Sequence, residues 1–154
     1  AGGGKVVQLV KNLVTAYSSG STTVPNDDTI PTNTEGINVG LDTAITPTSA
    51  TNRLLIVATI NISHNNATVD FVSSLFQDSG SSSIASGMGS GAGSQRSQQI
   101  IITHEMAAGT TSSTTFKVRA GSVTAGTISF NGDSGARKYG GAAQSSMLIW
   151  EIAT

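Results

Sequence analysis

The sequence predicts an all-β protein, an antiparallel β-sandwich of jelly-roll type with about eight strands. Two observations lead to this fold class. Apolar residues come in short runs, several with strict alternation of apolar and polar positions, and turns rich in Gly, Ser, Asn and Pro separate the runs. Beyond the first segment, no stretch has the apolar spacing of a helix. Short, regularly spaced strands joined by such turns are typical of a β-sandwich.

The first apolar stretch, residues 6–14, fits a strand or a helix by its spacing alone. It is rich in valine and is followed by Thr15 and Tyr17, and such side chains pack well on a pleated surface. We therefore favour a strand. A polar segment with Pro25 and Pro31 fills residues 18–36, where we expect a long loop.

The next two strands are predicted at residues 37–41 and 53–63. The second of these is the clearest strand in the chain, because its first half is apolar on both faces and its second half alternates. In that second half, we expect Ile60 and Ile62 to point inward and Asn61 and Ser63 to point outward.

Strands are also predicted at residues 69–76 and 97–106. Between them, the segment 77–96 is rich in Ser and has Gly at every second position from 87 to 93. Because it is long and poor in apolar groups, we expect it to be a mobile surface excursion.

The last three strands are expected at residues 114–119, 127–130 and 146–152, with a tight turn at Asn131 and Gly132. Alternation assigns the side chains of these strands to faces. We expect one set to point into the core, namely Phe116, Val118, Ile128 and Phe130, and we expect Leu148, Trp150 and Ile152 to share the face opposite Met147 and Ile149.

No repeat and no linker divides the chain, so we predict a flexible Gly-rich N-terminus at residues 1–4 and a single β-sandwich domain at 5–154. Ala1 fits removal of an initiator Met, from which we expect a complete small protein. A tag remnant would explain the glycine run equally well.

Several predicted strands are apolar on both faces. One face packs on the opposite sheet, and the other needs cover from a second subunit or from the long loops at 18–36 and 77–96. We favour the subunit interface, since a chain of 154 residues has little capacity to cover itself.

The composition excludes several classes of function. Ser and Thr number 42 and Gly 18, whereas charged residues are only 11%, against roughly 25% in an ordinary soluble domain. The net charge is −1 without blocks of like charge, which argues against a charge-driven partner such as nucleic acid or a membrane surface. No apolar run is long enough to insert into a membrane, and the absence of Cys excludes disulfides and thiolate chemistry.

One tetrapeptide suggests catalysis. Gly132-Asp133-Ser134-Gly135 matches the surroundings of the nucleophile in trypsin-like serine proteases, where a His takes the serine proton. The match is of low specificity in a chain rich in Gly and Ser, and neither His64 nor His104 has the sequence context of that family. We interpret the tetrapeptide as a hairpin turn and predict no enzymatic activity, with a serine hydrolase built on Ser134 as the remote alternative.

We predict no metal site and no cofactor. His104 and Glu105 could open a zinc-binding helical motif, but that motif needs a second His where this chain has Ala108. Residues 26–28 are rich in Asp, yet they lack the alternating ligand spacing of a calcium loop and fit a turn.

Three residues form the only compact basic and aromatic cluster, Arg137, Lys138 and Tyr139, in a loop flanked by glycine. A tyrosine beside cations suits contacts with sugars or with carboxylates of a partner. We take these three residues as candidate ligand or receptor contacts. A solvated loop or a subunit contact is the alternative interpretation.

A spaced pattern of short segments covers nearly the whole chain: residues 4–8 (GKVVQ), 45–56 (ITPTSATNRLLI), 116–119 (FKVR), 128–132 (ISFNG) and 140–152 (GGAAQSSMLIWEI). Together these segments resemble the tail-fibre and fibre-tip domains of tailed bacteriophages. The resemblance implies a β-sandwich that assembles as a homotrimer. It also implies a structural or adhesive role at the surface of a virion, without catalysis, so no catalytic residue carries over.

Two functions follow from this resemblance. In the first, the chain is a trimeric tail-fibre-like adhesin that contacts host-surface glycans through its loops. In the second, it is a decoration or cement protein that stabilises the capsid head. Either function implies other virion proteins, of the tail or of the capsid, as partners.

Overall fold

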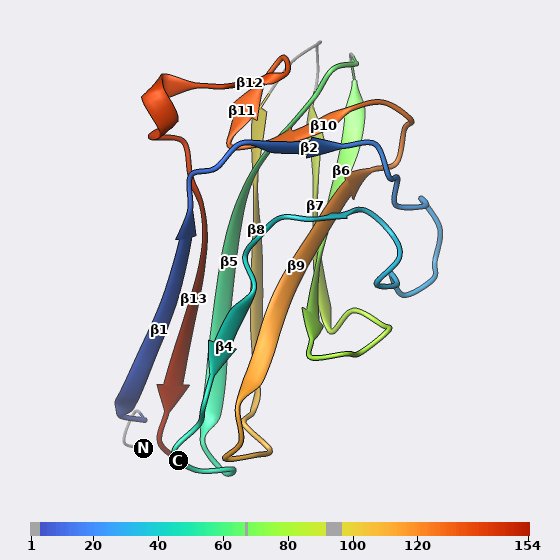
Figure 1. The fold of residues 1–154 in the computed structure, drawn as a ribbon. Helices are drawn as coiled ribbons and strands as arrows, with labels where there is room; N and C mark the ends of the chain where they lie inside the picture. The colour runs from blue at the N-terminus through green and yellow to red at the C-terminus, as the bar shows by residue number, and fades with distance from the viewer. Residues whose placement is uncertain (1–3, 67, 92–96) are drawn as a thin grey trace.

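The computed structural model describes residues 4–66, 68–91 and 97–154. Two antiparallel sheets face each other across one core (Figure 1). The first sheet contains six strands: β1 (Val6–Val14), β2 (Ser18–Gly20), β5 (Arg53–His64), β8 (Ser97–Ala107), β10 (Ile128–Phe130) and β13 (Ser145–Ile152). The second contains five: β3 (Ile37–Asn38), β4 (Thr43–Ile45), β6 (Val69–Gln77), β7 (Ala85–Gly91) and β9 (Thr114–Ser122).

A small hairpin of β11 (Gly132–Asp133) and β12 (Ala136–Arg137) and a 3-10 turn, η1 (Tyr139–Gly141), complete the fold. The predicted all-β antiparallel sandwich is therefore confirmed. The described residues form thirteen strands rather than about eight, because the sequence pattern does not reveal β2, β4, β7, β11 and β12. No helix in the part of the chain that the structure describes is long and apolar enough to cross a membrane.

The long strand β5 organises the first sheet. It pairs with β13 and β10 along one edge and with β8 along the other, and β1 pairs with β13. The segment 6–14 is thus a strand, as its valines predicted. Its register with β13 shifts by a bulge between Val6 and Gln8.

The core lies between the inward faces of β5, β6, β9 and β13. Period-2 alternation, with side chains pointing alternately to the two faces of a strand, assigns these residues, and the predicted inward positions are buried. Each fully buried large apolar side chain stabilises the fold by roughly 1.5–3 kcal/mol. The largest buried side chains come from both sheets and from the segment between β3 and β4: Leu41, Ile45, Leu54, Ile56, Ile60, Ile62, Phe71, Leu75, Phe116, Ile128, Phe130 and Met147.

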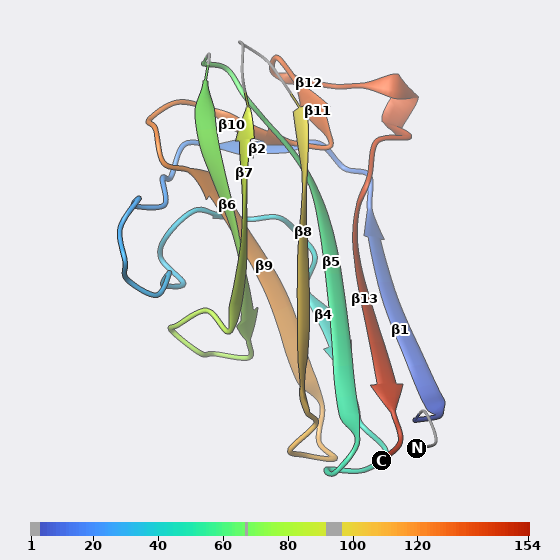
Figure 2. The same cartoon turned by 180° about the vertical axis from the view of Figure 1, so that it is seen from behind.

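Gly87, Gly89 and Gly91 belong to β7 and not to a surface excursion, so the prediction was wrong for this part of the segment. β7 is the edge strand of the second sheet and lies beside β8 of the first (Figure 2). A Cβ at Gly87 would come within 2.9 Å of the Ile101 carbonyl oxygen, and one at Gly91 within 3.1 Å of the Phe71 ring. The inward glycines therefore let the two sheet edges approach each other. Residues 78–84 of the predicted excursion do form a loop between β6 and β7, and residues 92–96 lie outside the described residues.

The loop between β2 and β3 covers the outer face of the second sheet. The Arg119 guanidinium donates to the carbonyl oxygens of Glu35 (2.9 Å) and Gly36 (2.7 Å) and so ties the loop to β9. Phe76 points outward, in register with Lys117, yet it is buried. The loop therefore supplies cover for the part of this sheet around β9.

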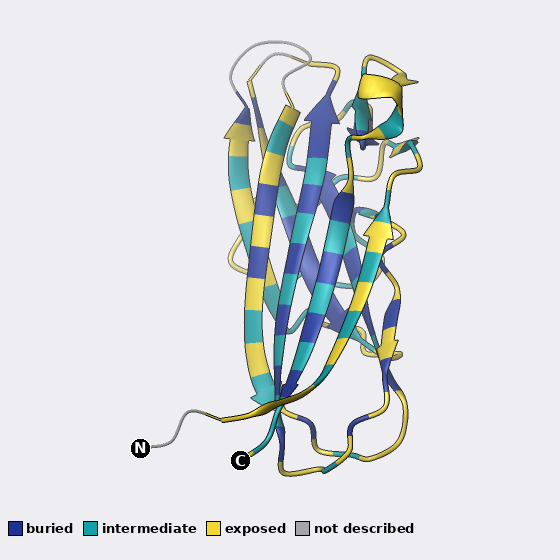
Figure 3. Ribbon diagram, turned by 90° about the vertical axis from the view of Figure 1, so that its left-hand side faces the viewer, coloured by how far each residue is buried: buried dark blue, intermediate teal, exposed yellow. Residues whose placement is uncertain are grey.

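The outer face of the first sheet has no such cover within the described residues. Figure 3 looks onto this sheet, whose strands alternate between buried and less buried positions. Ser63 is an exception, because it lies on the outward side and is buried, with its hydroxyl donating to the Gly132 carbonyl at 2.9 Å.

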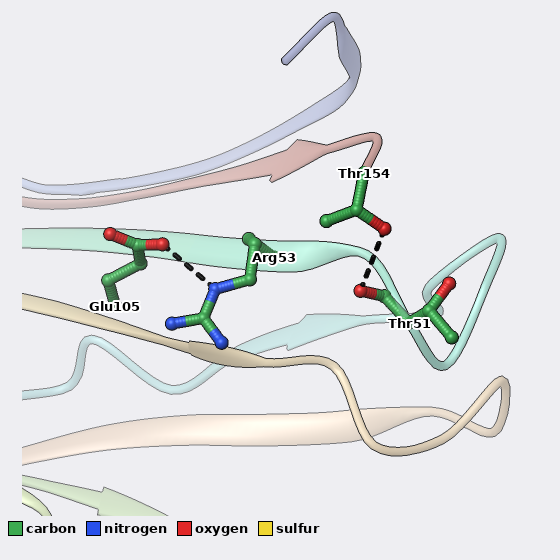
Figure 4. Close-up of polar contacts among 4 residues, drawn as sticks. All are labelled: Thr51, Arg53, Glu105 and Thr154. Carbon is green, nitrogen blue, oxygen red and sulfur yellow. Dashed lines mark hydrogen bonds and ion pairs between the residues drawn. The ribbon is translucent and has the colours of Figure 1, made fainter. Parts of the chain in front are cut away.

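At the end of the sandwich where both termini lie, polar contacts fix the chain. Thr154 Oγ1 donates to the Thr51 carbonyl at 3.2 Å, and Arg53 Nε donates to Glu105 Oε1 at 2.8 Å (Figure 4). Glu151 is fully buried nearby. Burial raises the pKa of Glu151, but hydrogen bonds from Asn52 and from the Thr48–Ser49 turn outweigh it and hold the pKa below its ordinary value of 4.5.

Candidate ligand-binding site

The candidate ligand residues lie at the end of the sandwich opposite the termini (Figure 1). Asn131 anchors the chain where it leaves β10. Its side chain is fully buried, donates to the carbonyl oxygens of Val14 and Ala16 at 3.0 Å each, and accepts from Ser145 Oγ at 2.8 Å. The sequence suggested a turn here, but Asn131 is an internal tie between the ends of β1, β10 and β13.

The tight turn lies three residues later, at Ser134 and Gly135. Both have positive φ, 53° and 76°, as the two-residue turn of a β11–β12 hairpin requires. The tetrapeptide Gly132-Asp133-Ser134-Gly135 is thus a hairpin, as expected, although its turn is not at Asn131–Gly132. The hairpin places the Asp133 side chain next to β5.

A run of left-handed backbone then shapes the loop. Tyr139, Gly140 and Gly141 have φ of 53°, 64° and 91°, a conformation that glycine adopts freely and tyrosine rarely. The Arg137 side chain lies over Gly141, where a Cβ would come within 2.9 Å of Nη1. This geometry holds Tyr139 out in solvent, with 85% of its surface exposed.

A cavity of about 450 Å³ lies between this loop, the hairpin and the end of β5. Its lining includes two of the three candidate residues, Lys138 and Tyr139, while Arg137 is outside it. Sequence reasoning missed the other residues of the lining: Asn61, Ser97, Gly132, Asp133, Ala142 and Ala143.

The polar groups of the cavity are of both kinds, donor and acceptor. The Asn61 side chain is held by donating to the Gln144 carbonyl, while its Oδ1 accepts from Gln99 Nε2 at 3.4 Å. Asp133 Oδ1 is buried and finds no hydrogen-bond partner among the described residues. Lys138 forms no ion pair with any described residue. The cavity therefore combines a positive donor with a carboxylate acceptor.

The sequence contained a feature that could have pointed to Asn61 and another that could have pointed to Asp133. Asn61 is a polar residue between Ile60 and Ile62 in the clearest predicted strand, and Asp133 belongs to the tetrapeptide. Nothing local showed that these two residues meet Lys138, because 77 positions separate Asn61 from Lys138 in the chain.

A second cavity, of about 320 Å³, brings together Ser134 and His64, the residues of the hydrolase alternative. No hydrogen bond joins their side chains. His64 Nδ1 instead accepts the Asn66 amide at 2.9 Å, so neutral His64 carries its proton on Nε2. A general base needs an unprotonated nitrogen facing the nucleophile, which this arrangement does not provide.

Burial lowers the pKa of His64 below its ordinary value of 6.5, although a contact with the Thr124 carbonyl opposes the effect. The side chain packs edge-on to Phe71, with ring centroids 6.3 Å apart. His64 is therefore a core histidine that caps one end of the sandwich.

The remaining polar motifs have structural roles. His104 lies on β8 in register with Ile56, and Glu105 pairs with Arg53. Asp27 Oδ1 accepts from both the amide and the hydroxyl of Thr29, and these bonds lower its pKa below the ordinary value of 3.8. Within the described residues, no group of three or more His, Asp or Glu side chains could hold a metal ion.

Comparison with known proteins supports the fold. No family model and no curated protein sequence matches this chain. Among solved structures, the chain is similar to the Eiger TNF of S. frugiperda, with a TM-score of 0.54, 12% identity, and coverage of 97% of this chain and 94% of that chain. The protein is a β-sandwich of jelly-roll type, as predicted. At this identity the likeness concerns the fold alone.

Proposed function

We propose that the chain is a non-catalytic structural module of a tailed-phage virion, which assembles as a homotrimer and contacts the host surface with its loops. The observation that supports the proposed trimer is the uncovered apolar face of the first sheet. Its exposed apolar side chains include Leu9 and Leu13 on β1, each 51% exposed, and Ile101 on β8, 57% exposed.

The face is continuous across four strands. Cross-strand neighbours point to the same side of a sheet, and Leu9 is in register with Trp150, which is in register with Leu55. Half-buried apolar side chains fill the space between the exposed ones: Leu55, Val57, Leu148, Trp150 and Ile152. Contiguous apolar surface of this kind marks an interaction site.

The free energies involved favour a protein surface as the partner that covers this apolar face. Covering a half-exposed leucine or isoleucine contributes about 1 kcal/mol, whereas association costs about 4–15 kcal/mol. Leu9, Leu13 and Ile101 cannot offset that cost alone, so the whole face has to be covered. A second copy of the chain supplies a flat strand-built surface of suitable extent.

The charges at the margins of the face suit a cyclic arrangement of copies. Lys11 is exposed on β1, one edge of the sheet, and Glu105 is exposed on β8, the opposite edge. In a ring, one edge of each subunit approaches the other edge of the next. The lysine of one copy then lies toward the acid of its neighbour, in keeping with the trimer that the fibre resemblance implies.

The position of the termini supports the adhesive function. Both termini lie at one end of the sandwich, and the β11–β12 hairpin and the 450 Å³ cavity lie at the other (Figure 1). A module that is held at its termini end presents the cavity outward.

Sedimentation equilibrium tests the assembly. We expect a mass three times the 15.5 kDa of the chain, and we expect the double variant Leu9→Asp/Leu13→Asp to sediment as a folded monomer. Met88→Asp is the matched control, because Met88 is 78% exposed but lies on β7, outside the face. A monomeric wild-type chain would overturn the trimer. Copy number in intact particles separates the two virion roles: few copies at the tail support the adhesin, and hundreds on the shell support capsid decoration.

A further inference from the structure

We propose that the 450 Å³ cavity binds one neutral hexose-type sugar unit, with the sugar ring against Tyr139 and its hydroxyl groups on Asp133, Asn61 and Lys138. The biological meaning of this site rests on the proposed adhesive function, but binding of the sugar does not require the trimer. The volume falls within the roughly 300–1,000 Å³ of small-ligand sites.

The polar groups indicate a polyol. A hydroxyl group both donates and accepts, so vicinal hydroxyls can donate to the Asp133 carboxylate and accept from the Lys138 ammonium group, since both residues line the cavity. Lys138 would attract an anionic ligand, but Asp133 would repel it. A cationic ligand would be attracted by Asp133 and repelled by Lys138. The pair therefore selects an uncharged ligand with several hydroxyls.

Apart from Ser97, the rest of the lining is largely apolar. Gly132, Ala142 and Ala143 offer no polar side chain, and the Tyr139 ring stands exposed beside them. A sugar ring has an apolar face of C–H groups between its hydroxyls, and an aromatic ring covers such a face well. A bound sugar that covers the Tyr139 ring thus accounts for the exposure of 85% of this side chain beside the cavity.

The site is preorganised by its backbone. Tyr139 holds φ of 53° without the freedom of glycine, and such strain persists only where neighbouring structure imposes it. Here the Arg137 side chain packs over Gly141, and the Asn61 amide is tied to the Gln144 carbonyl. Little conformational entropy then remains to be lost on binding.

The test is saturation-transfer NMR and titration of the purified full chain with four neutral sugars (glucose, galactose, mannose and N-acetylglucosamine) and with glucuronic acid. We expect at least one neutral sugar to bind and to shift the Tyr139 ring signals. Tyr139→Ala and Lys138→Ala should each weaken binding by about tenfold or more, while Tyr139→Phe, which keeps the ring, should stay within about threefold. Lys117→Ala is the matched control, since Lys117 is a lysine on β9 that does not line the cavity, and it should leave the affinity unchanged.

Three results would overturn the proposal: no neutral sugar binds, glucuronic acid alone binds, or Lys117→Ala weakens binding as much as Lys138→Ala. The sedimentation mass of the same samples keeps the two proposals apart. A trimer that binds no sugar overturns this inference alone, and a monomer that binds one overturns only the assembly.

Discussion

Asn52 and Glu151 stand 99 positions apart in the chain, and the Asn52 amide donates to Glu151 Oε1 at 2.7 Å in the interior of the protein. The same oxygen accepts from the amide and the hydroxyl of Thr48 and from the amide of Ser49. One carboxylate thus holds the loop that leads into β5 against the last strand.

Glu151→Ala should lower the free energy of unfolding by about 2–4 kcal/mol, because it leaves the buried Asn52 amide and the turn amides without an acceptor. Urea denaturation measures the loss. Glu105→Ala is the control, since Glu105 is an exposed acid with one ionic partner, and it should change stability by about 1 kcal/mol or less. Equal losses in the two variants would contradict the role of Glu151.

The protein should lose stability in acid through the same group. The folded-state pKa of Glu151 lies below its ordinary value of 4.5, so the unfolded chain binds the proton more readily. The contribution is present above pH 4.5 and is lost as the pH falls through the folded-state pKa. Unfolding measured from pH 6 to pH 3 should therefore show a steeper decline for the wild type than for Glu151→Gln; parallel curves would count against it.

His64 should produce a separate pH dependence at higher pH. Its folded-state pKa lies below 6.5 because burial disfavours the charged ring. The unfolded chain therefore takes up the proton first, and stability falls as the pH drops from about 6.5 towards the folded-state pKa. His64→Gln should abolish this decline, and His104→Gln should leave it intact. NMR titration of the two rings provides the direct measurement.

Gly87 and Gly89 form a matched pair on β7. A Cβ at Gly87 would press on the Ile101 carbonyl at 2.9 Å, whereas one at Gly89 would make ordinary contact with the Ile100 side chain at 3.5 Å. Gly87→Ala should destabilise the protein by about 1–3 kcal/mol, and Gly89→Ala should be nearly neutral. Thermal unfolding of both variants measures these changes in stability. A larger loss for Gly89→Ala than for Gly87→Ala would mean that β7 does not approach β8 as described.

Ser134 should not react with a serine-directed phosphonate. Its side chain forms no hydrogen bond with His64, which carries its proton on the nitrogen that a base would need free. Intact-mass spectrometry after incubation provides the measurement. Labelling that Ser134→Ala abolishes would revive the hydrolase alternative.

The loops show where sequence reasoning reached its limit. The glycines of residues 87–91 looked like low complexity, because a strand whose inward side chains are absent has no hydrophobic pattern. Phe76 and Glu151 show the same limit for single residues. Alternation placed them on strands, but it did not show that Phe76 is buried on an outward position or that the Thr48 amide, 103 positions away, donates to Glu151.

The sequence by itself determined the fold class, the main strands and the inward faces of those strands, because the period of two is a local property of the extended backbone. It also singled out Lys138 and Tyr139. Only the tertiary structure decided that these two share a cavity with Asn61 and Asp133 and that Arg137 lies outside it. It decided as well which sheet is covered by a loop and which is left bare. Those outcomes depend on strand register and on contacts between distant segments, and no local pattern of residues encodes them.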